Sequence, residues 1–195
     1  VAQRWGFSLM KRLLIIGAGG HGRSVAEAVV AQGTYSLIGF VDDGCVPGTL
    51  VFQWPVLGSA ASLSELKKQA DCVVVAVGNN VVREKMVSLA LAAGFELATV
   101  IHPRAFVSPS AAVGPGSAIM AGCVVGAEAR LGVATIVNSG AVVDHHAVVE
   151  DYGHLGVGAC MAGDSYLGRS AWMQAGSALA YGVNVPAGYV LAPGQ

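Results

Sequence analysis

A short polar stretch in the second half of the chain carries the residues best suited to chemistry. Val143-Asp144-His145-His146 interrupts a tract of aliphatic and small residues, and His154 follows nine residues after His145. A nucleophilic amine must be neutral, and an imidazole with a pKa near neutrality can take the proton that the attacking amine loses. We therefore predict His145 as a general base, with Asp144 and His154 as further candidate catalytic residues. An inert surface position is the alternative, and it is favoured for His146.

The glycine-rich segment from Gly17 to Gly22 is a second candidate site. It follows an apolar run at 13–16, matches the pattern G-x-G-x-x-G and precedes an expected helix at 23–32. A strand expected at 37–41 then ends in two aspartates, about twenty residues after the glycines. This is the context of a dinucleotide-binding fingerprint, in which the backbone approaches a pyrophosphate and the helix N-terminus stabilises its charge. The segment predicts a nucleotide site, without establishing NAD as the nucleotide.

The candidate nucleotide-binding residues are Gly17, Gly19, Gly20, His21, Gly22, Asp42 and Asp43. His21 could reach a phosphate or a sugar, but capping of the helix or plain exposure is an equal alternative. The two aspartates could bind the base or the ribose, although an acid at the end of a strand is also a common turn residue.

The remaining segments of the first half predict a small α/β unit with a parallel sheet. After an extended segment at 55–58, we expect helices near 63–69 and 83–93 and strands at 72–77 and 96–101. The unit is too short for a full two-halved dinucleotide fold. His102-Pro103 marks its end, because proline breaks the pattern. We therefore predict domains at 10–103 and 104–195, with residues 1–9 as a leader or an added extension.

An apolar residue recurs at every sixth position from Val107 to Leu191. The residues two positions before the next apolar one are mostly small, for example Ala141 and Ser165. A period of six fits neither a helix nor a half-buried strand, whose repeats are 3.6 and 2. It indicates a solenoid in which each short strand sends one aliphatic side chain inward and small residues occupy the corners.

The composition argues against a nucleic-acid-binding protein and against a membrane-spanning one. The formal charge is −1 and charged residues make up 12% of the chain, so no basic face indicates a nucleic-acid partner. Hydrophobic content is 54%, but no stretch approaches the ~20 apolar residues of a spanning helix, so we expect a soluble protein without membrane insertion. The four cysteines lack metal-ligand spacing, which favours reduced thiols in the cytoplasm and no metal site.

The repeat pattern [LIV]-Gly-x4 resembles that of the hexapeptide-repeat acyltransferases. These enzymes form left-handed parallel β-helices with three hexapeptides per coil, and they are usually trimers with acyl-coenzyme A between neighbouring helices. The resemblance implies about five coils here. From Met10 onward, the chain is similar to the nucleotide-sugar N-acetyltransferases that modify UDP-4-amino sugars or GDP-perosamine, and to the related sialic acid O-acetyltransferases. The matching segments are Gly-Ala-Gly-Gly-His-Gly, Val-Asp-Asp, Val-Gly-Asn-Asn, Ile-His-Pro and the stretch 138–163.

This resemblance implies roles for several residues. His145 matches the proposed general base, His154 a histidine near the acetyl group and the sugar, and Gly163 the glycine whose amide faces the thioester carbonyl. Further positions implied are Ala162 and Gly176 for the cofactor and Asn79 and Asn138 for the sugar nucleotide. The N-terminal domain of the family holds the nucleotide-sugar rather than a redox cofactor, and the sugar would reach across to His145.

Two departures from the family pattern stand out. The family usually has a carboxylate after the catalytic histidine, where this chain has His146. A neutral imidazole can accept a hydrogen bond but supplies no charge. Asp144 is the obvious substitute, although neighbouring strand residues point to opposite faces. The family also usually continues through a Gly-x-Pro-Ala-(Lys/Arg) segment, so we expect part of the coenzyme A pocket to lie beyond Gln195.

The leading hypothesis is an acetyl-CoA-dependent N-acetyltransferase acting on the 4-amino group of a nucleotide-linked deoxy-sugar, as a cytoplasmic homotrimer in surface-glycan synthesis. An O-acetyltransferase for sialic acid or another sugar is the first alternative. A non-catalytic nucleotide-sugar-binding trimer is the second. A dehydrogenase is disfavoured, because no second domain carries a hydride-transfer constellation.

Overall fold

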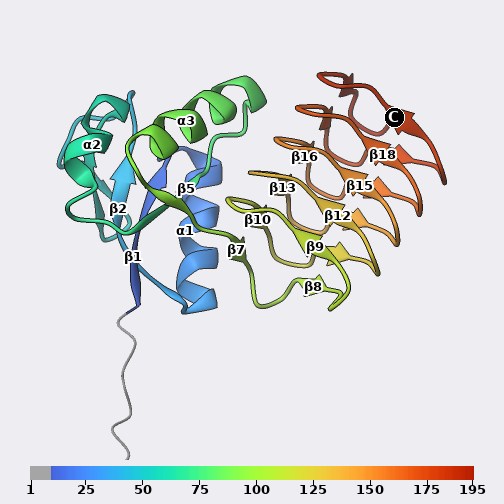
Figure 1. Cartoon of the computed structure of the whole chain (residues 1–195), viewed down its shortest axis with the longest axis horizontal. Helices are drawn as coiled ribbons and strands as arrows, with labels where there is room; N and C mark the ends of the chain where they lie inside the picture. Colours follow the sequence, from blue (N-terminus) through green and yellow to red (C-terminus); the bar gives the residue numbers. More distant parts are fainter. Residues whose placement is uncertain (1–9) are drawn as a thin grey trace, which may run out of the picture.

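The computed structural model describes residues 10–195, which form an α/β domain and a prism of stacked coils lying side by side (Figure 1). The elements of the α/β domain are β1 (Lys11–Ile16), α1 (Gly20–Gln32), β2 (Tyr35–Val41), β3 (Leu50–Val51), β4 (Trp54–Gly58), a 3-10 turn (Ala60–Ser62), α2 (Leu63–Leu66), β5 (Cys72–Val75), α3 (Asn80–Ala92) and β6 (Glu96–Leu97). The predicted leader at 1–9 lies outside the described residues.

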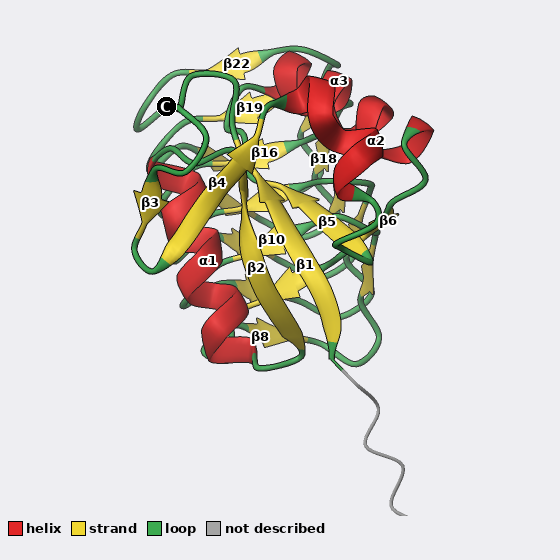
Figure 2. Cartoon of the chain, turned by 90° about the vertical axis from the view of Figure 1, so that its left-hand side faces the viewer, coloured by secondary structure: helices red, strands yellow, loops and turns green. Residues whose placement is uncertain are grey.

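The sheet of the α/β domain has the order β3-β4-β2-β1-β5-β6 and is parallel except for the β3–β4 pair (Figure 2). Strand β1 is buried on both faces, as a continuous apolar run requires. Leu13 and Ile15 pack in the cluster that contains α1, whereas Leu14 and Ile16 pack with α2 and α3. Helices therefore cover both faces of the sheet, and the glycine turn follows its central strand.

The second part is a parallel β-helix built from two-residue strands. They are β7 (Val100–Ile101), β8 (Phe106–Val107), β9 (Ala112–Val113), β10 (Ala118–Ile119), β11 (Val124–Val125), β12 (Arg130–Leu131), β13 (Ile136–Val137), β14 (Val142–Val143), β15 (Val148–Val149), β16 (His154–Leu155), β17 (Cys160–Met161), β18 (Tyr166–Leu167), β19 (Trp172–Met173), β20 (Ala178–Leu179), β21 (Asn184–Val185) and β22 (Val190–Leu191). They form three parallel sheets, β7 to β22, β8 to β20 and β9 to β21.

The interior of the β-helix confirms the repeat that the sequence predicts. The second residue of every strand from β8 to β22 is the apolar residue of the sixfold pattern, and Val125, Val143 and Leu155 are fully buried. Small residues fill the corners, where Ala141 and Ser165 are also buried. At roughly 1.5–3 kcal/mol per buried aliphatic side chain, these columns are the main source of stability for this part.

The predicted strand at 96–101 is in fact two strands in different sheets. β6 pairs with β5 in the α/β domain, whereas β7 pairs with β10 in the β-helix. The chain passes between them at Ala98-Thr99, so the predicted boundary after residue 103 falls inside the first coil. A single repeat unit such as Val100–Ile101 has no period to distinguish it from the preceding strand.

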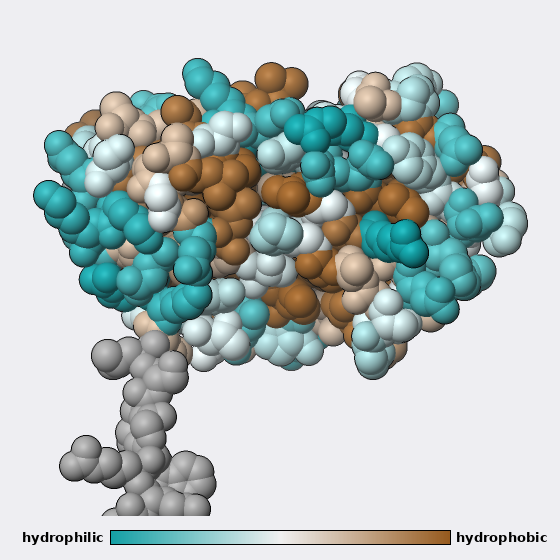
Figure 3. Space-filling model, viewed as in Figure 1, coloured by the Kyte–Doolittle hydropathy of each residue, from teal (hydrophilic) through white to brown (hydrophobic). Residues whose placement is uncertain are grey.

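Other boundaries differ by a few residues. α1 and α3 each begin three residues earlier than predicted, α2 ends three residues earlier, and the short strand β3 is an addition. On the face drawn in Figure 3, hydrophobic residues gather across the middle and hydrophilic residues toward the two ends. None of the helices within residues 10–195 is long and apolar enough to cross a bilayer.

The glycine turn packs tightly at one end and is open at the other. A Cβ on Gly22 would overlap the carbonyl oxygen of Gly17, and Gly17 itself has φ +108°, in the region that favours glycine. Around Gly19 and Gly20, by contrast, no atom lies within 4 Å of where a Cβ would be. The first and last glycines are therefore needed for packing, and the middle ones border open space.

Replacing Gly22 with alanine is expected to destabilise the fold by roughly 1–3 kcal/mol, because the added methyl overpacks the turn against a backbone carbonyl. Gly19→Ala is the matched control, and its expected change is within about 0.5 kcal/mol. Urea unfolding measures both. Equal effects of the two substitutions would contradict the packing argument.

Candidate functional site

The turn before α1 presents an uncapped helix N-terminus to open space. Helix α1 begins at Gly20, and its N-cap residue Gly19 makes no side-chain hydrogen bond to the helix. The first N–H groups of a helix lack intrahelical partners and carry the positive end of its dipole. This end of the turn can therefore bind an anionic group such as a phosphate.

The two aspartates after β2 have different roles. Asp42 accepts the backbone N–H of Ala18 through Oδ2 and that of Gly44 through Oδ1, both at 2.8 Å. Burial acts to raise the pKa of this carboxyl, but these hydrogen bonds outweigh it and the pKa is lowered. Asp42 thus fixes the shape of the glycine turn, and Asp43 is the acid better placed for a ligand.

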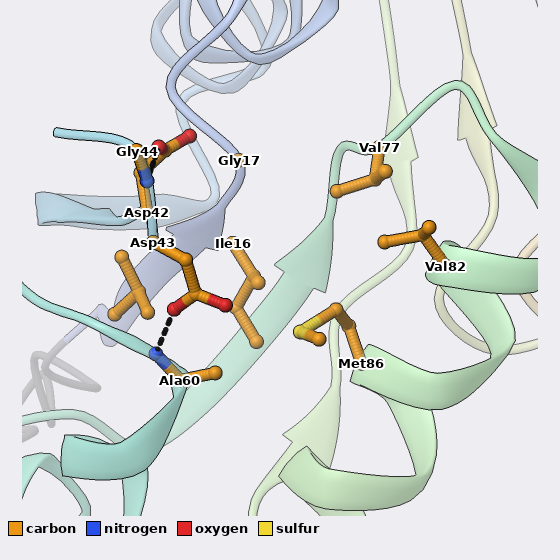
Figure 4. Close-up of a pocket in the computed structure, with 10 residues that line it drawn as sticks. Ile16, Gly17, Asp42, Asp43, Gly44, Ala60, Val77, Val82 and Met86 are labelled. Carbon is orange, nitrogen blue, oxygen red and sulfur yellow. Dashed lines mark hydrogen bonds between the residues drawn. The ribbon is translucent and has the colours of Figure 1, made fainter.

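Asp43 lines a pocket of about 200 Å³ at the carboxyl end of the sheet (Figure 4). Its Oδ1 accepts the backbone N–H of Ala60 at 2.7 Å. Facing the carboxylate are apolar side chains from β1, α3 and the loop between β5 and α3, namely Ile16, Val77, Val82 and Met86. Apolar walls with one hydrogen-bond acceptor suit a planar heterocycle with an N–H group.

Arg83 joins the α/β domain to the β-helix from a fully buried position on α3. Its Nε donates to the carbonyl of Ala134 at 2.8 Å, and Nη2 donates to that of Tyr152 at 2.5 Å. Nη1 donates to the carbonyls of Val77 and Gly78 at 2.9 and 3.2 Å. Burial lowers the pKa of the guanidinium to about 10, so it stays charged at neutral pH. The sequence pattern carried no signal for this role, since an arginine on a helix usually faces solvent.

His154 lies between the two parts of the molecule. Its strand β16 belongs to the sheet that contains β7, and its Nδ1 is 3.1 Å from the carbonyl oxygen of Gly78. Its ring stacks on Trp172 with centroids 5.2 Å apart. Burial, followed by the positive charge of Arg83, lowers the pKa of His154 to about 3. An imidazole this difficult to protonate is suited to hydrogen bonding and not to general base catalysis at neutral pH.

His21 belongs to the same interface. Burial and then the charge of Arg83 lower its pKa to about 4, and His21 in turn contributes to the lowered pKa of His154. The Nε2 of His21 is buried and has no hydrogen-bond partner among residues 10–195. A ligand group entering between the domain and the β-helix could supply that partner.

The remaining predicted residues lie at a helix cap or at corners of the β-helix. Asn79 caps α3, where its side chain accepts the backbone N–H of Val82 at 3.0 Å. Asn138 accepts the N–H of Ser139 at 2.9 Å, at the corner between β13 and β14. Gly176 lies at the same corner two coils further on, with φ +69°. Neither Asn138 nor Gly176 shares a corner with His145.

His145 occupies the corner between β14 and β15, the edge of the prism opposite the sheet that carries His154. It is exposed, and its backbone N–H donates to Oδ1 of Asp144 at 2.7 Å. Among the hydrogen bonds within residues 10–195, none joins Asp144 to the imidazole. Asp144 therefore supports the turn, and no hydrogen bond to the imidazole of His145 supports the catalytic role predicted for it.

Gly163 lies one coil beyond His145 and leaves room for its ring. A Cβ on Gly163 would lie 2.5 Å from Cε1 and 2.6 Å from Nε2 of His145. The ring of Tyr181, one further coil along, has its centroid 6.5 Å from that of His145. The N–H of Gly163 is not used by the hydrogen bonds within residues 10–195, whereas its neighbour Ala162 donates to the carbonyl of Leu179. Gly163 therefore offers a free donor beside the imidazole.

The structure thus brings the predicted residues together as two groups on opposite sides of the prism. One group comprises the glycine turn, Asp43, His21 and His154, beside the sheet that begins with β7. The other comprises His145 with Ala162 and Gly163, at the far corner. Within one chain the nucleotide end and His145 lie on opposite sides of the prism, so the expected reach of a bound sugar to that histidine stays a prediction. Within residues 10–195 no group of three or more metal-ligating side chains is present.

Comparison with known proteins gives matches to both parts of the chain. Residues 12–89 match the family described as the PglD N-terminal domain. A crystal structure of a point mutant of perosamine N-acetyltransferase from Caulobacter crescentus, in complex with CoA and GDP-perosamine, is similar with a TM-score of 0.86 and 35% identity. The match covers 95% of this chain and 90% of that one.

Two further proteins are similar. The acetyltransferase domain of PglB from Neisseria gonorrhoeae, in complex with acetyl coenzyme A, has a TM-score of 0.79 and 38% identity over 94% of this chain and 91% of that one. UDP-N-acetylbacillosamine N-acetyltransferase from Bacillus subtilis strain 168 is 32% identical over 101 residues, which is 51% of this chain and 46% of that protein. The chain thus matches about half the length of this curated relative. Together the matches confirm the predicted family resemblance and fold class.

Acidification is expected to weaken the fold through His21 and His154. Their pKa values of about 4 and about 3 lie below the ordinary value of 6.5, so below pH 6.5 the unfolded chain binds more protons than the folded one. Stability is therefore full above pH 6.5 and falls as the pH is lowered toward 4 for His21 and toward 3 for His154. For His154 the expected loss is about 1–2 kcal/mol at pH 5.

Urea unfolding at pH 7.5 and pH 5 measures this loss. His154→Asn is expected to be less stable than the wild type at pH 7.5, because it gives up the contact with Trp172, but to lose less on acidification. An equal loss in the variant and the wild type would show that this histidine is not the source.

Proposed function

This chain belongs to the family of nucleotide-amino-sugar N-acetyltransferases, and we propose that it transfers the acetyl group of acetyl-CoA to the 4-amino group of a UDP- or GDP-linked deoxy-sugar. The observation that carries the proposal is the likeness, over more than nine-tenths of this chain, to a perosamine N-acetyltransferase with CoA and GDP-perosamine bound. The matched enzymes are N-acetyltransferases, which favours an amine acceptor over the hydroxyl of the alternative. Surface-glycan synthesis is the use we propose for the product.

We assign the nucleotide-sugar to the α/β domain. The uncapped N-terminus of α1 and the open space at Gly19 and Gly20 would hold the diphosphate. The pocket beside Asp43 would hold the base, with the carboxylate accepting a base N–H group. As neutral rings, His21 would hydrogen-bond to the phosphate or the sugar, and His154 would accept a hydrogen bond from a sugar hydroxyl.

We assign the acetyl group of acetyl-CoA to the β-helix corner at His145. The sugar amine would attack the thioester carbonyl carbon, forming a C–N bond while the carbonyl oxygen gains negative charge beside the N–H of Gly163. His145 would take the proton that the amine loses. As the C–S bond breaks, the imidazolium would return this proton to the departing thiolate, giving the amide and free coenzyme A. No covalent enzyme intermediate is required.

The separation of these two groups within one chain supports self-association. A sugar held by one protomer would meet His145 of a second protomer, and a homotrimer gives each site the same composition. Exposed apolar side chains on the β-helix, such as Val124, Val157 and Tyr189, provide surface for such contacts. All four cysteines are free thiols, in keeping with the cytoplasm as the proposed compartment.

Free thiol is expected when the protein is incubated with acetyl-CoA and one of a panel of UDP-, GDP- and dTDP-linked 4-amino-4-deoxy-sugars. His145→Ala is expected to lower kcat by about 100-fold or more, because it removes the base. His102→Ala, a histidine elsewhere on the chain, is the control and should retain activity. Nucleotide-sugar binding without thiol release would favour the non-catalytic alternative.

A mixture of two inactive variants tests whether the site is shared. Gly19→Leu fills the open space of the glycine turn, and His145→Asn removes the base from the other corner. Co-expressed chains are expected to recover about a quarter of the wild-type activity, because a random assembly pairs an intact turn with an intact histidine at that frequency. If the mixture stays as inactive as its components, each site is formed within a single chain.

A further inference from the structure

His146, which replaces the carboxylate usual in the family, has a polar neighbour on each side. Its Nδ1 lies 3.0 Å from Nδ1 of His145, and its Nε2 lies 3.4 Å from Oε2 of Glu128. The two imidazole rings are perpendicular, with centroids 5.3 Å apart. A carboxylate, an imidazole and the candidate base thus form a continuous chain of contacts.

The repeat holds these side chains in register. Glu128 and His146 are 18 residues apart, with φ 58° and 59°, so they occupy the same left-handed turn position in successive coils. The N–H of His146 donates to the carbonyl of Ala127 at 2.9 Å, which fixes the spacing of the two turns. Parallel side chains from stacked turns can therefore contact each other without distortion.

These contacts determine which nitrogens carry protons. An ionised Glu128 carboxylate can accept a hydrogen bond but cannot donate one. Its position near Nε2 of His146 therefore favours the tautomer of His146 that carries its proton on Nε2. The Nδ1 of that ring is then an acceptor, and it receives the N–H of Nδ1 of His145. The proton of His145 is thereby held on Nδ1, and its Nε2 keeps a free lone pair. That nitrogen is the one close to Gly163, where the proposed thioester carbonyl would lie.

We propose that Glu128 is a positioning residue that acts through His146 to orient His145 and to stabilise its protonated form. The proposal rests on the function proposed above, in which Nε2 of His145 takes the proton of the amine. The positive charge that forms on His145 is then balanced by the carboxylate one coil away, through a neutral ring. We call this arrangement of Glu128, His146 and His145 the relay. The proton on Nδ1 of His145 stays in place throughout, so the relay requires no second proton acceptor.

The neighbouring acids do not provide this contact. Asp144 gives its Oδ1 to the backbone N–H of His145, and Asp164 occupies the next coil at the same left-handed turn position as His146. Within residues 10–195, Glu128 is the acid whose carboxylate lies within 4 Å of an imidazole nitrogen of His146. Asp164→Asn is therefore a matched control, because it removes a charge one coil from His146 on the other side.

The first test is kinetic. Glu128→Gln is expected to lower kcat roughly 10-fold with KM for both substrates unchanged, and to move the acid limb of the pH profile to lower pH. The limb moves because the protonated imidazole loses its balancing charge. Asp164→Asn should leave both kcat and the limb near their wild-type values. Adding His146→Asp to Glu128→Gln should restore kcat, since it puts a carboxylate beside the base.

The second test needs no turnover, so it separates failure of the relay from failure of the proposed function. ¹⁵N-resolved NMR of the histidine rings at pH 7.5 is expected to find the proton of His145 on Nδ1 in the wild type and in Asp164→Asn, and distributed over both nitrogens in Glu128→Gln. A wild-type proton on Nε2, or identical spectra for all three proteins, would overturn the relay. The expected spectra without thiol release from any donor would leave the relay standing and reject the acetyl transfer.

Discussion

The buried guanidinium of Arg83 is the interaction on which the arrangement of the two halves depends. A charge without solvent is costly unless its hydrogen bonds are made, and here the acceptors are backbone carbonyls. Two of them belong to the loop after β5, and the other two, at Ala134 and Tyr152, belong to corners of the β-helix. Because both sets are needed, the charge is satisfied only when the α/β domain is docked on the coils.

The same charge determines the state of the histidines at this interface. It lies close enough to act with burial in lowering the pKa of His21 and of His154, so both rings are neutral at physiological pH. The carbonyl of Gly78 accepts hydrogen bonds from Arg83 and from Nδ1 of His154, which leaves Nε2 of His154 as an acceptor. The acceptor nitrogen of His154 suits the hydroxyl group of a sugar, and the exposed His145 is the histidine that we propose as the base.

The sequence predicted the strands that belong to a repeating pattern. It did not predict where the chain passes from one sheet to the other, or which polar residue is buried. Fifteen strands followed from the sixfold spacing because each inward position must be apolar and each corner small. The first strand, Val100–Ile101, was not separated from β6, since one unit has no period. The motif predicted His145 and Gly163, which the structure places side by side, whereas Met86 and Val82 of the pocket look like ordinary core residues in the sequence. Arg83 could not be found, because its partners are carbonyls that any sequence provides.

A coil of 18 residues places an acid of one coil beside a histidine of the next. Residues 18 apart lie in register in successive coils, so side chains at equivalent corner positions form a column and can contact one another. His145, Gly163 and Tyr181 form one such column, and Glu128 and His146 belong to the next. A substitution at His146 is therefore coupled to Glu128 of the preceding coil as well as to the adjacent His145. In a β-helix, the acid that serves a histidine can come from the column as well as from the adjacent residue.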